Sequence, residues 1–76
     1  MNDIQKENLL RKMEKGRAYE EGWLIRHTGT NCSVQELNDM VQVGLLLKID
    51  KDPNDFMSDN QYMITEAGLR FIQKQI

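Results

Sequence analysis

The 76-residue chain has few of the residues that cross-link, ligate metals or catalyse: one cysteine, Cys32, and one histidine, His27. A lone cysteine excludes an internal disulfide, and one Cys with one His cannot supply the four ligands of a structural zinc site. Nothing in the sequence orients the two residues as a nucleophile and its base, so a buried or incidental cysteine is the better interpretation. We therefore predict that the protein is not an enzyme and carries no metal and no cofactor.

Long hydrophobic runs are also missing. No stretch approaches the roughly 18 apolar residues that cross a membrane. The polar N-terminus MNDIQKEN lacks the apolar core of a signal peptide. Together with the single cysteine, which fits a reducing compartment, these absences predict a cytoplasmic protein with no membrane partner.

Basic charge is not in excess. Ten basic and 12 acidic residues give a formal net charge of -2. Residues 1–27 hold six of the basic residues against five acidic ones, whereas residues 28–76 hold four against seven. Strong nucleic-acid binders usually carry a basic surface, and this chain shows one only as a patch.

The length predicts a single domain over residues 1–76, and the first helix signal stands at its N-terminus. Asn2 and Gln5 have the spacing of a capping box, and Gly16 is placed to end the helix. We predict a helix over about residues 2–15. Its expected apolar stripe consists of Ile4, Leu9, Leu10 and Met13.

A second helix is predicted over residues 17–27. Tyr19 and Trp23 lie four residues apart, a spacing at which aromatic side chains are usually part of the core. The residues HTGTN, 27–31, are then a turn with glycine at its centre.

The third helix, over residues 33–43, has the clearest start. Ser33 and Glu36 make a second capping box, and Gly44 ends the helix. The side chains expected to face the core are Val34, Leu37, Met40 and Val41. Those expected to face outward with the same spacing are Gln35, Asn38 and Gln42.

A hairpin over about residues 45–65 follows, and then a last helix over 66–75. Alternation predicts Leu45, Leu47 and Ile49 on one face of the first strand. Thr65 is placed to cap the last helix, whose expected buried stripe consists of Leu69, Ile72 and Ile76. The chain is therefore predicted to be α+β and mostly α: three helices, a β-hairpin and a C-terminal helix.

Two segments resemble winged helix-turn-helix domains of the PadR-like and MarR-like bacterial regulators: ELNDMVQVGLLLK, residues 36–48, and YMITEAGLRFI, residues 62–72. The second fits the step Tyr–x–Leu–Thr–x–x–Gly that opens the helix after the wing, with Ile64 in place of Leu. The resemblance implies that residues 33–43 are the recognition helix and residues 50–60 the wing. The size and style of the chain favour a bacterial source, or a phage or mobile element.

In such a domain the recognition helix enters the major groove of double-stranded DNA. Amide side chains can bond an adenine edge bidentately, and a helix N-terminus can hold a phosphate. The leading hypothesis is thus a DNA-binding regulator. Its expected base readers are Gln35, Asn38 and Gln42, and its phosphate contacts Ser33, Arg26, Lys48 and Lys51.

The carboxylates near this surface favour an alternative. Glu36 and Asp39 share the face of the proposed readers, and four more lie in the loop: Asp50, Asp52, Asp55 and Asp59. Each is repelled by phosphate. The alternative is a winged helix that binds protein, as an adaptor or inhibitor, through the acidic wing with Phe56 and Met57 or through the last helix ending at Ile76. That last helix is equally suited to a homodimer.

The loop DKDPNDFMSDNQ begins like a calcium-binding loop. The match then fails, because the sixth position is Asp55 rather than Gly and the twelfth is Gln61 rather than Glu. A solvated turn is the favoured interpretation, and a loose divalent-cation site is a minor alternative.

Overall fold

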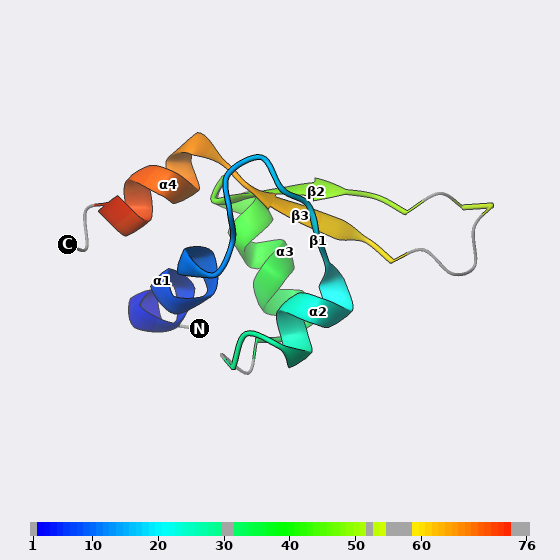
Figure 1. Ribbon diagram of the computed structural model, residues 1–76, viewed down its shortest axis with the longest axis horizontal. Helices are drawn as coiled ribbons and strands as arrows, with labels where there is room; N and C mark the ends of the chain where they lie inside the picture. The colour runs from blue at the N-terminus through cyan, green and yellow to red at the C-terminus, as the bar shows by residue number, and fades with distance from the viewer. Residues whose placement is uncertain (1, 30–31, 52, 55–58, 74–76) are drawn as a thin grey trace.

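The structure, a computed structural model, describes residues 2–29, 32–51, 53–54 and 59–73. Within these residues four helices and a three-stranded antiparallel sheet form a small α+β fold, which confirms the predicted class (Figure 1). In chain order the elements are α1 (Asp3–Arg11), β1 (Tyr19–Glu20), α2 (Glu21–Arg26), α3 (Val34–Gln42), β2 (Leu46–Ile49), β3 (Gln61–Ile64) and α4 (Glu66–Gln73).

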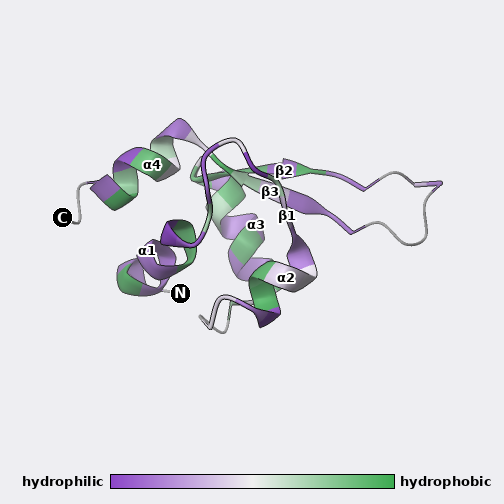
Figure 2. Cartoon of the chain, viewed as in Figure 1, coloured by the Kyte–Doolittle hydropathy of each residue, from purple (hydrophilic) through white to green (hydrophobic). Residues whose placement is uncertain are grey.

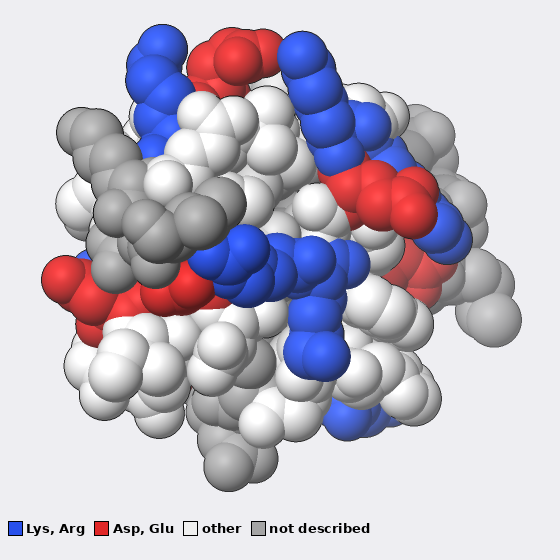
Figure 3. Space-filling view, turned by 60° about the vertical axis from the view of Figure 1, so that its left-hand side comes forward, with Lys and Arg blue, Asp and Glu red and all other residues white. Residues whose placement is uncertain are grey.

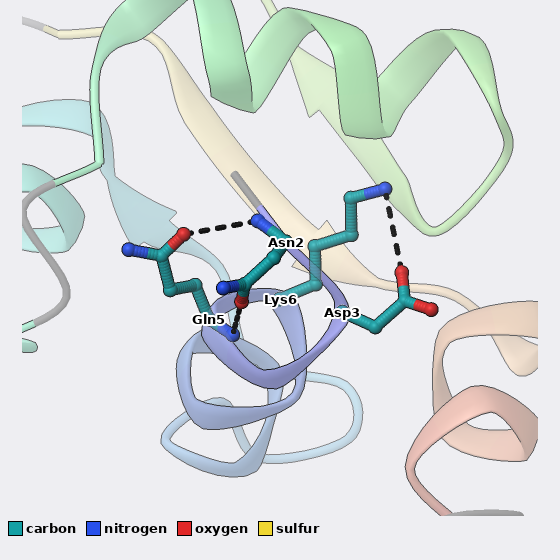
Figure 4. A network of polar contacts seen from close by, with 4 residues as sticks. All are labelled: Asn2, Asp3, Gln5 and Lys6. Carbon is teal, nitrogen blue, oxygen red and sulfur yellow. Dashed lines mark hydrogen bonds and ion pairs between the residues drawn. The ribbon is translucent and has the colours of Figure 1, made fainter.

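Helix α1 begins as predicted. The side chain of Asn2 accepts a hydrogen bond from the Gln5 amide (2.8 Å), and the Asn2 amide donates to Gln5 Oε1 (2.9 Å) (Figure 4). Lys6 Nζ lies 4.0 Å from Asp3 Oδ1 beside this box. The predicted place of Ile4 in the apolar stripe is wrong, because its side chain is 69% exposed.

Helix α1 is also shorter than predicted, ending at Arg11 rather than near residue 15. After it the chain turns, with Gly16 at φ 81°. The Glu14 amide donates to the hydroxyl of Tyr19 (2.8 Å) and the Arg17 amide donates to the Glu14 carbonyl (3.2 Å). These bonds hold the chain in a turn, so the helix does not continue.

The predicted helix over residues 17–27 is wrong in its first half. Tyr19 and Glu20 form strand β1, which pairs antiparallel with β3 at Tyr62 and Gln61. Only Glu21–Arg26 is helical, as α2. A helical spacing of apolar residues is a local signal, and pairing with a strand about 40 residues later overrides it. Trp23, expected in the core, is 38% exposed.

Helix α3 confirms its predicted start and end. Ser33 and Glu36 form the capping box, and Gly44 follows the helix at φ 88°. Leu37 and Met40 are buried, whereas Val34, predicted to face the core, is 42% exposed.

Strands β2 and β3 form the predicted hairpin, with Leu46 opposite Ile64 and Lys48 opposite Tyr62. Leu46, Ile64 and Tyr62 are buried, and Leu47 is 55% exposed on the other face. The alternation predicted Leu45 on the same face as Leu47, and this prediction is wrong. Leu45 is buried, because it precedes the strand and its amide donates to the carbonyl of Met40 (2.9 Å).

Helix α4 is capped by Thr65, as predicted. The Thr65 hydroxyl accepts from the Gly68 amide (3.0 Å) and donates to the carbonyl of Gly44 (2.6 Å). Leu69 and Ile72 pack against the core, and the predicted contact of Ile76 lies outside the described residues.

The elements enclose one core, with α3 packed on β2 and α1 packed on α4. Its buried apolar side chains are Leu9, Leu10, Met13, Tyr19, Leu24, Cys32, Leu37, Met40, Leu45, Leu46, Tyr62 and Ile64. The hairpin projects away from the end that holds α1 and α4 (Figure 1). The described residues of the hairpin beyond the paired strands are hydrophilic, whereas the helices each show apolar residues (Figure 2). In the described part of the chain no helix is long and apolar enough to cross a membrane.

Candidate nucleic-acid interface

The three predicted base readers lie on the side of α3 that faces away from the core. Gln35 and Gln42 are exposed, and Asn38 is half-buried. Gln35 Nε2 donates to Asp39 Oδ1 (3.0 Å), one turn further along the helix. A DNA base would therefore have to compete with Asp39 for the Gln35 amide.

Ser33 is engaged by its own helix. Its hydroxyl accepts from the Glu36 amide (3.2 Å) and donates to Glu36 Oε1 (3.1 Å), which also accepts from the Ser33 amide (3.2 Å). The Glu36 carboxylate therefore occupies the helix N-terminus, where the sequence predicted a phosphate contact. A phosphate would have to displace it.

The three predicted cations lie near the hairpin, and carboxylates lie beside two of them. Lys48 Nζ is 4.0 Å from Asp50 Oδ1. The Arg26 guanidinium and the Asp59 carboxylate both lie beside Gly22. A Cβ built on Gly22 would be 3.9 Å from Arg26 Cζ and 3.4 Å from Asp59 Oδ2. Lys51 is exposed. Among the described contacts, none joins these cations to the outward side chains of α3.

A polar network at the base of the hairpin was not predicted. The buried Tyr62 hydroxyl donates to Glu21 Oε2 (2.7 Å), and the Glu21 amide donates to the Asn60 carbonyl (2.9 Å). The Gly22 amide donates to Asp59 Oδ2 (3.2 Å). Burial, and after it the hydrogen bond and charge of Glu21, raise the pKa of Tyr62 above its ordinary value. The network fixes the hairpin against the start of α2, and no local sequence signal marks it.

Basic side chains gather elsewhere, over the end formed by α1 and α4. Figure 3 shows Lys and Arg side chains crossing the middle of that face, with Asp and Glu side chains beside them on both sides. Arg11 is bonded there to Glu7 (2.7 Å) and to the carbonyl of Ile72 (3.1 Å). Lys15 Nζ lies 3.3 Å from Glu66 Oε1. Arg11 therefore ties α1 to α4, and Lys15 ties the turn after α1 to α4.

The residues predicted for a protein partner cannot be placed, because Phe56, Met57 and Ile76 lie outside the described residues. The described chain has other exposed apolar side chains, which the sequence reasoning missed. Leu47 is 55% exposed and Ile49 38% on the outer face of β2, and Val43 is 65% exposed just before that strand. The alternation along β2 was visible in the sequence, but the sequence did not show which face of the strand the core covers.

The calcium-like loop remains an expectation. Asp52 and Asp55 lie outside the described residues. In the ranges that are described, no cluster of three or more His, Cys, Asp and Glu side chains is placed to hold a metal ion. Cys32 is buried and its thiol donates to the carbonyl of Leu24 (3.4 Å), whereas His27 is exposed.

Fold and surface define a small α+β protein with a polar outward helix beside a projecting antiparallel hairpin. Comparison of the chain with protein-family models, with curated proteins and with solved structures found no match in any of the three.

Proposed function

We propose that the protein is a non-enzymatic winged-helix regulator that binds double-stranded DNA through α3 and the hairpin. The observation that carries the proposal is the amide face of α3, where Gln35, Asn38 and Gln42 lie away from the core on a well-capped helix. Amide side chains in this position can read adenine edges once the helix enters the major groove.

The order of elements supports the proposal. A capped helix, α3, is followed by the β2–β3 hairpin and then by α4, which is the order of recognition helix, wing and following helix that the resemblance implies. The hairpin extends beyond the helical body, as a wing must in order to reach a neighbouring groove or backbone (Figure 1).

The charges determine what kind of binding to expect. Glu36 and Asp39 would be repelled by phosphate, and the cations placed near the hairpin are Arg26, Lys48 and Lys51. Each phosphate neutralised contributes about −0.9 to the slope of log K against log salt. Three such neutralised phosphates predict a slope of at most about −3, shallow for a DNA-binding protein. Sequence preference would then come mainly from α3.

The test is selection from a pool of random DNA duplexes at about 50 and 200 mM salt, the range over which phosphate-driven binding falls steeply. We expect an enriched motif with adenine at the contacted positions. Asn38→Ala with Gln42→Ala should broaden the motif while leaving the salt slope unchanged. Gln73→Ala, an exposed amide on α4, is the matched control. Absence of retention at the lower salt would contradict the proposal.

A second test separates phosphate binding from base readout. Replacing Lys48 and Lys51 by Gln should weaken binding to all sequences alike and reduce the salt slope by about 1 for each phosphate that is no longer neutralised. Arg70→Gln, a cation on α4, is the control. An unchanged slope in the double variant would remove the hairpin from the interface.

The exposed apolar side chains of β2 favour a second candidate, a protein-interaction module. Strand β2 is an edge of the sheet, since the order is β1-β3-β2, and Leu47 and Ile49 stand on its outer face. An edge strand with exposed apolar side chains can pair with another chain. If a second copy is that partner, sedimentation equilibrium should show association that Leu47→Lys abolishes and Ile4→Lys does not. A monomer at all concentrations would exclude the homodimer.

A further inference from the structure

Four side chains at β1 and α2 contact one another in a row, Arg17, Tyr19, Trp23 and His27, of which the Tyr19 and Trp23 rings are stacked. The Tyr19 and Trp23 rings lie 5.0 Å apart, centroid to centroid, at an interplanar angle of 30°. The Arg17 guanidinium carbon lies 5.2 Å from the Tyr19 centroid, and the His27 ring lies 6.3 Å from that of Trp23. Both the guanidinium and the indole therefore lie against the same phenol ring.

An open pocket of about 310 Å³ lies along this row. It is lined by Arg17, Ala18, Tyr19, Glu20 and Trp23. This volume is at the lower end of the range for small-molecule sites, roughly 300–1,000 Å³. The lining combines two aromatic side chains with one cation and one carboxylate, so it offers a ligand both stacking surface and charged groups.

The Tyr19 side chain at the floor of the pocket is held by burial, strand pairing and a hydrogen bond. Tyr19 is 6% exposed, pairs in the sheet with Tyr62, and accepts the Glu14 amide on its hydroxyl (2.8 Å). The turn through Gly16 brings Arg17 back over the Tyr19 ring. A ligand that stacks here would order few side chains, so little of the binding free energy would be lost to ordering them.

Two groups of the pocket have binding capacity that the fold leaves unused. Trp23 is 38% exposed although indole is the side chain with the largest apolar surface to bury. Arg17 is exposed, and among the described residues its guanidinium makes a ring contact with Tyr19 and no ion pair. An indole and such a cation in the lining of one pocket attract a ligand that has both a flat ring and an anionic group.

We propose that this pocket binds a nucleotide: the base stacks on Trp23 and the phosphate bonds the Arg17 guanidinium. Arginine and phosphate match in a bidentate geometry, and bases of every kind stack on aromatic side chains. Glu20 at the pocket wall accepts a hydrogen bond from an exocyclic amino group, which favours adenine, guanine or cytosine over uracil and thymine. The proposal is independent of duplex binding by α3.

The chain offers a direct measurement, since Trp23 is its single tryptophan. Its fluorescence reports on this pocket and on no other. Titration with adenosine 5′-monophosphate should quench it saturably, with a Kd between about 10 µM and 1 mM for a ligand of that size. Adenosine, which lacks the anion, should bind about tenfold more weakly, and inorganic phosphate should not quench.

Variants separate the two interactions. Arg17→Gln should weaken adenosine monophosphate about tenfold and leave the weaker adenosine binding unchanged, whereas Arg70→Gln, the control, should change neither. Trp23→Phe loses the fluorescence signal, so its binding is followed by calorimetry. It should bind the nucleotide more weakly than the parent, because Phe offers a smaller ring.

A second titration, with single-stranded oligodeoxyadenylate, distinguishes a free nucleotide from an unpaired nucleotide within a strand. Tighter binding by the oligonucleotide than by the mononucleotide would assign the pocket to an unpaired nucleotide of a strand, and the reverse to a free nucleotide. Absence of saturable quenching by either ligand, or quenching that Arg17→Gln leaves unchanged, would overturn the proposal. A failed duplex selection would not affect this result.

Discussion

Among the five glycines, Gly68 has the least room for a side chain. A Cβ at this position of α4 would lie 2.5 Å from the carbonyl oxygen of Leu45 and 2.8 Å from Ile64 Cγ1. In an open helix, alanine would be more stable than glycine by about 1 kcal/mol. Here the nearest atom belongs to the backbone and cannot rotate away, so the steric cost decides the outcome.

Gly68→Ala is therefore expected to destabilise the protein by about 1–3 kcal/mol, the usual cost of overpacking. For a domain of this size 1 kcal/mol corresponds to about 4–8 °C in Tm. Thermal unfolding followed by circular dichroism measures the change. Arg70→Ala, exposed in the same helix, should stay within about 0.5 kcal/mol of the parent. A Tm at or above that of the parent in Gly68→Ala would show that α4 can shift away from Leu45.

Tyr62 predicts how stability depends on alkaline pH. Burial and the neighbouring Glu21 raise the pKa of Tyr62 above its ordinary value of 10.0, so the folded state holds this proton more tightly than the unfolded state. The contribution of protonated Tyr62 to the free energy of unfolding is complete below about pH 10 and is lost as the pH rises further. The free energy of unfolding, from urea titrations between about pH 8 and 11, should fall above pH 10. In Tyr62→Phe the fall should be smaller. An equal fall in both proteins would mean that Tyr62 titrates normally.

Helix α3 shows how much one element depends on its first turn. Ser33 and Glu36 satisfy amide groups that the helix itself leaves unpaired. Ser33→Ala should cost about 1 kcal/mol, and Ser33→Thr much less, because threonine keeps the hydroxyl. Urea unfolding measures both. If alanine and threonine cost the same, the hydroxyl is not what stabilises the helix.

The Ser33 variants also test whether the start of α3 takes part in DNA binding. If the Ser33 hydroxyl serves only the cap, Ser33→Ala should lower stability without changing the salt slope of DNA binding. Asn2→Ala removes the equivalent box of α1 and is the control for a purely structural loss. A reduced slope in Ser33→Ala alone would place a phosphate at the start of α3.

At the scale of the whole molecule, the first helix and the last helix of the described chain meet. Helix α1 packs on α4, and the Arg11 guanidinium donates to the carbonyl of Ile72, 61 residues away (3.1 Å). Both groups are near the solvent, so the bond should contribute modestly. Arg11→Gln is expected to cost up to about 1 kcal/mol, and Lys12→Gln close to nothing. Equal unfolding midpoints for all three proteins would show that packing of apolar residues alone joins α1 to α4.

The features that the sequence alone determined are those decided by neighbouring residues. The caps at Asn2, Ser33 and Thr65 depend on groups three residues away, so their spacing was enough to predict where α1, α3 and α4 begin. The two strands of the hairpin were visible as short apolar runs on either side of a polar loop, although their register was not. The α+β class followed from these elements.

Only the tertiary structure decided what depends on distant partners. Residues 19–20 have a helical pattern, yet they form β1 because their backbone groups pair with β3. The turn that follows α1 places Arg17, Tyr19 and Trp23 in one row, which no local spacing encodes. Alternation along β2 was readable, but which face is covered was decided by where α3 packs. Burial and strand pairing are properties of the assembled chain, so short-range patterns cannot specify them.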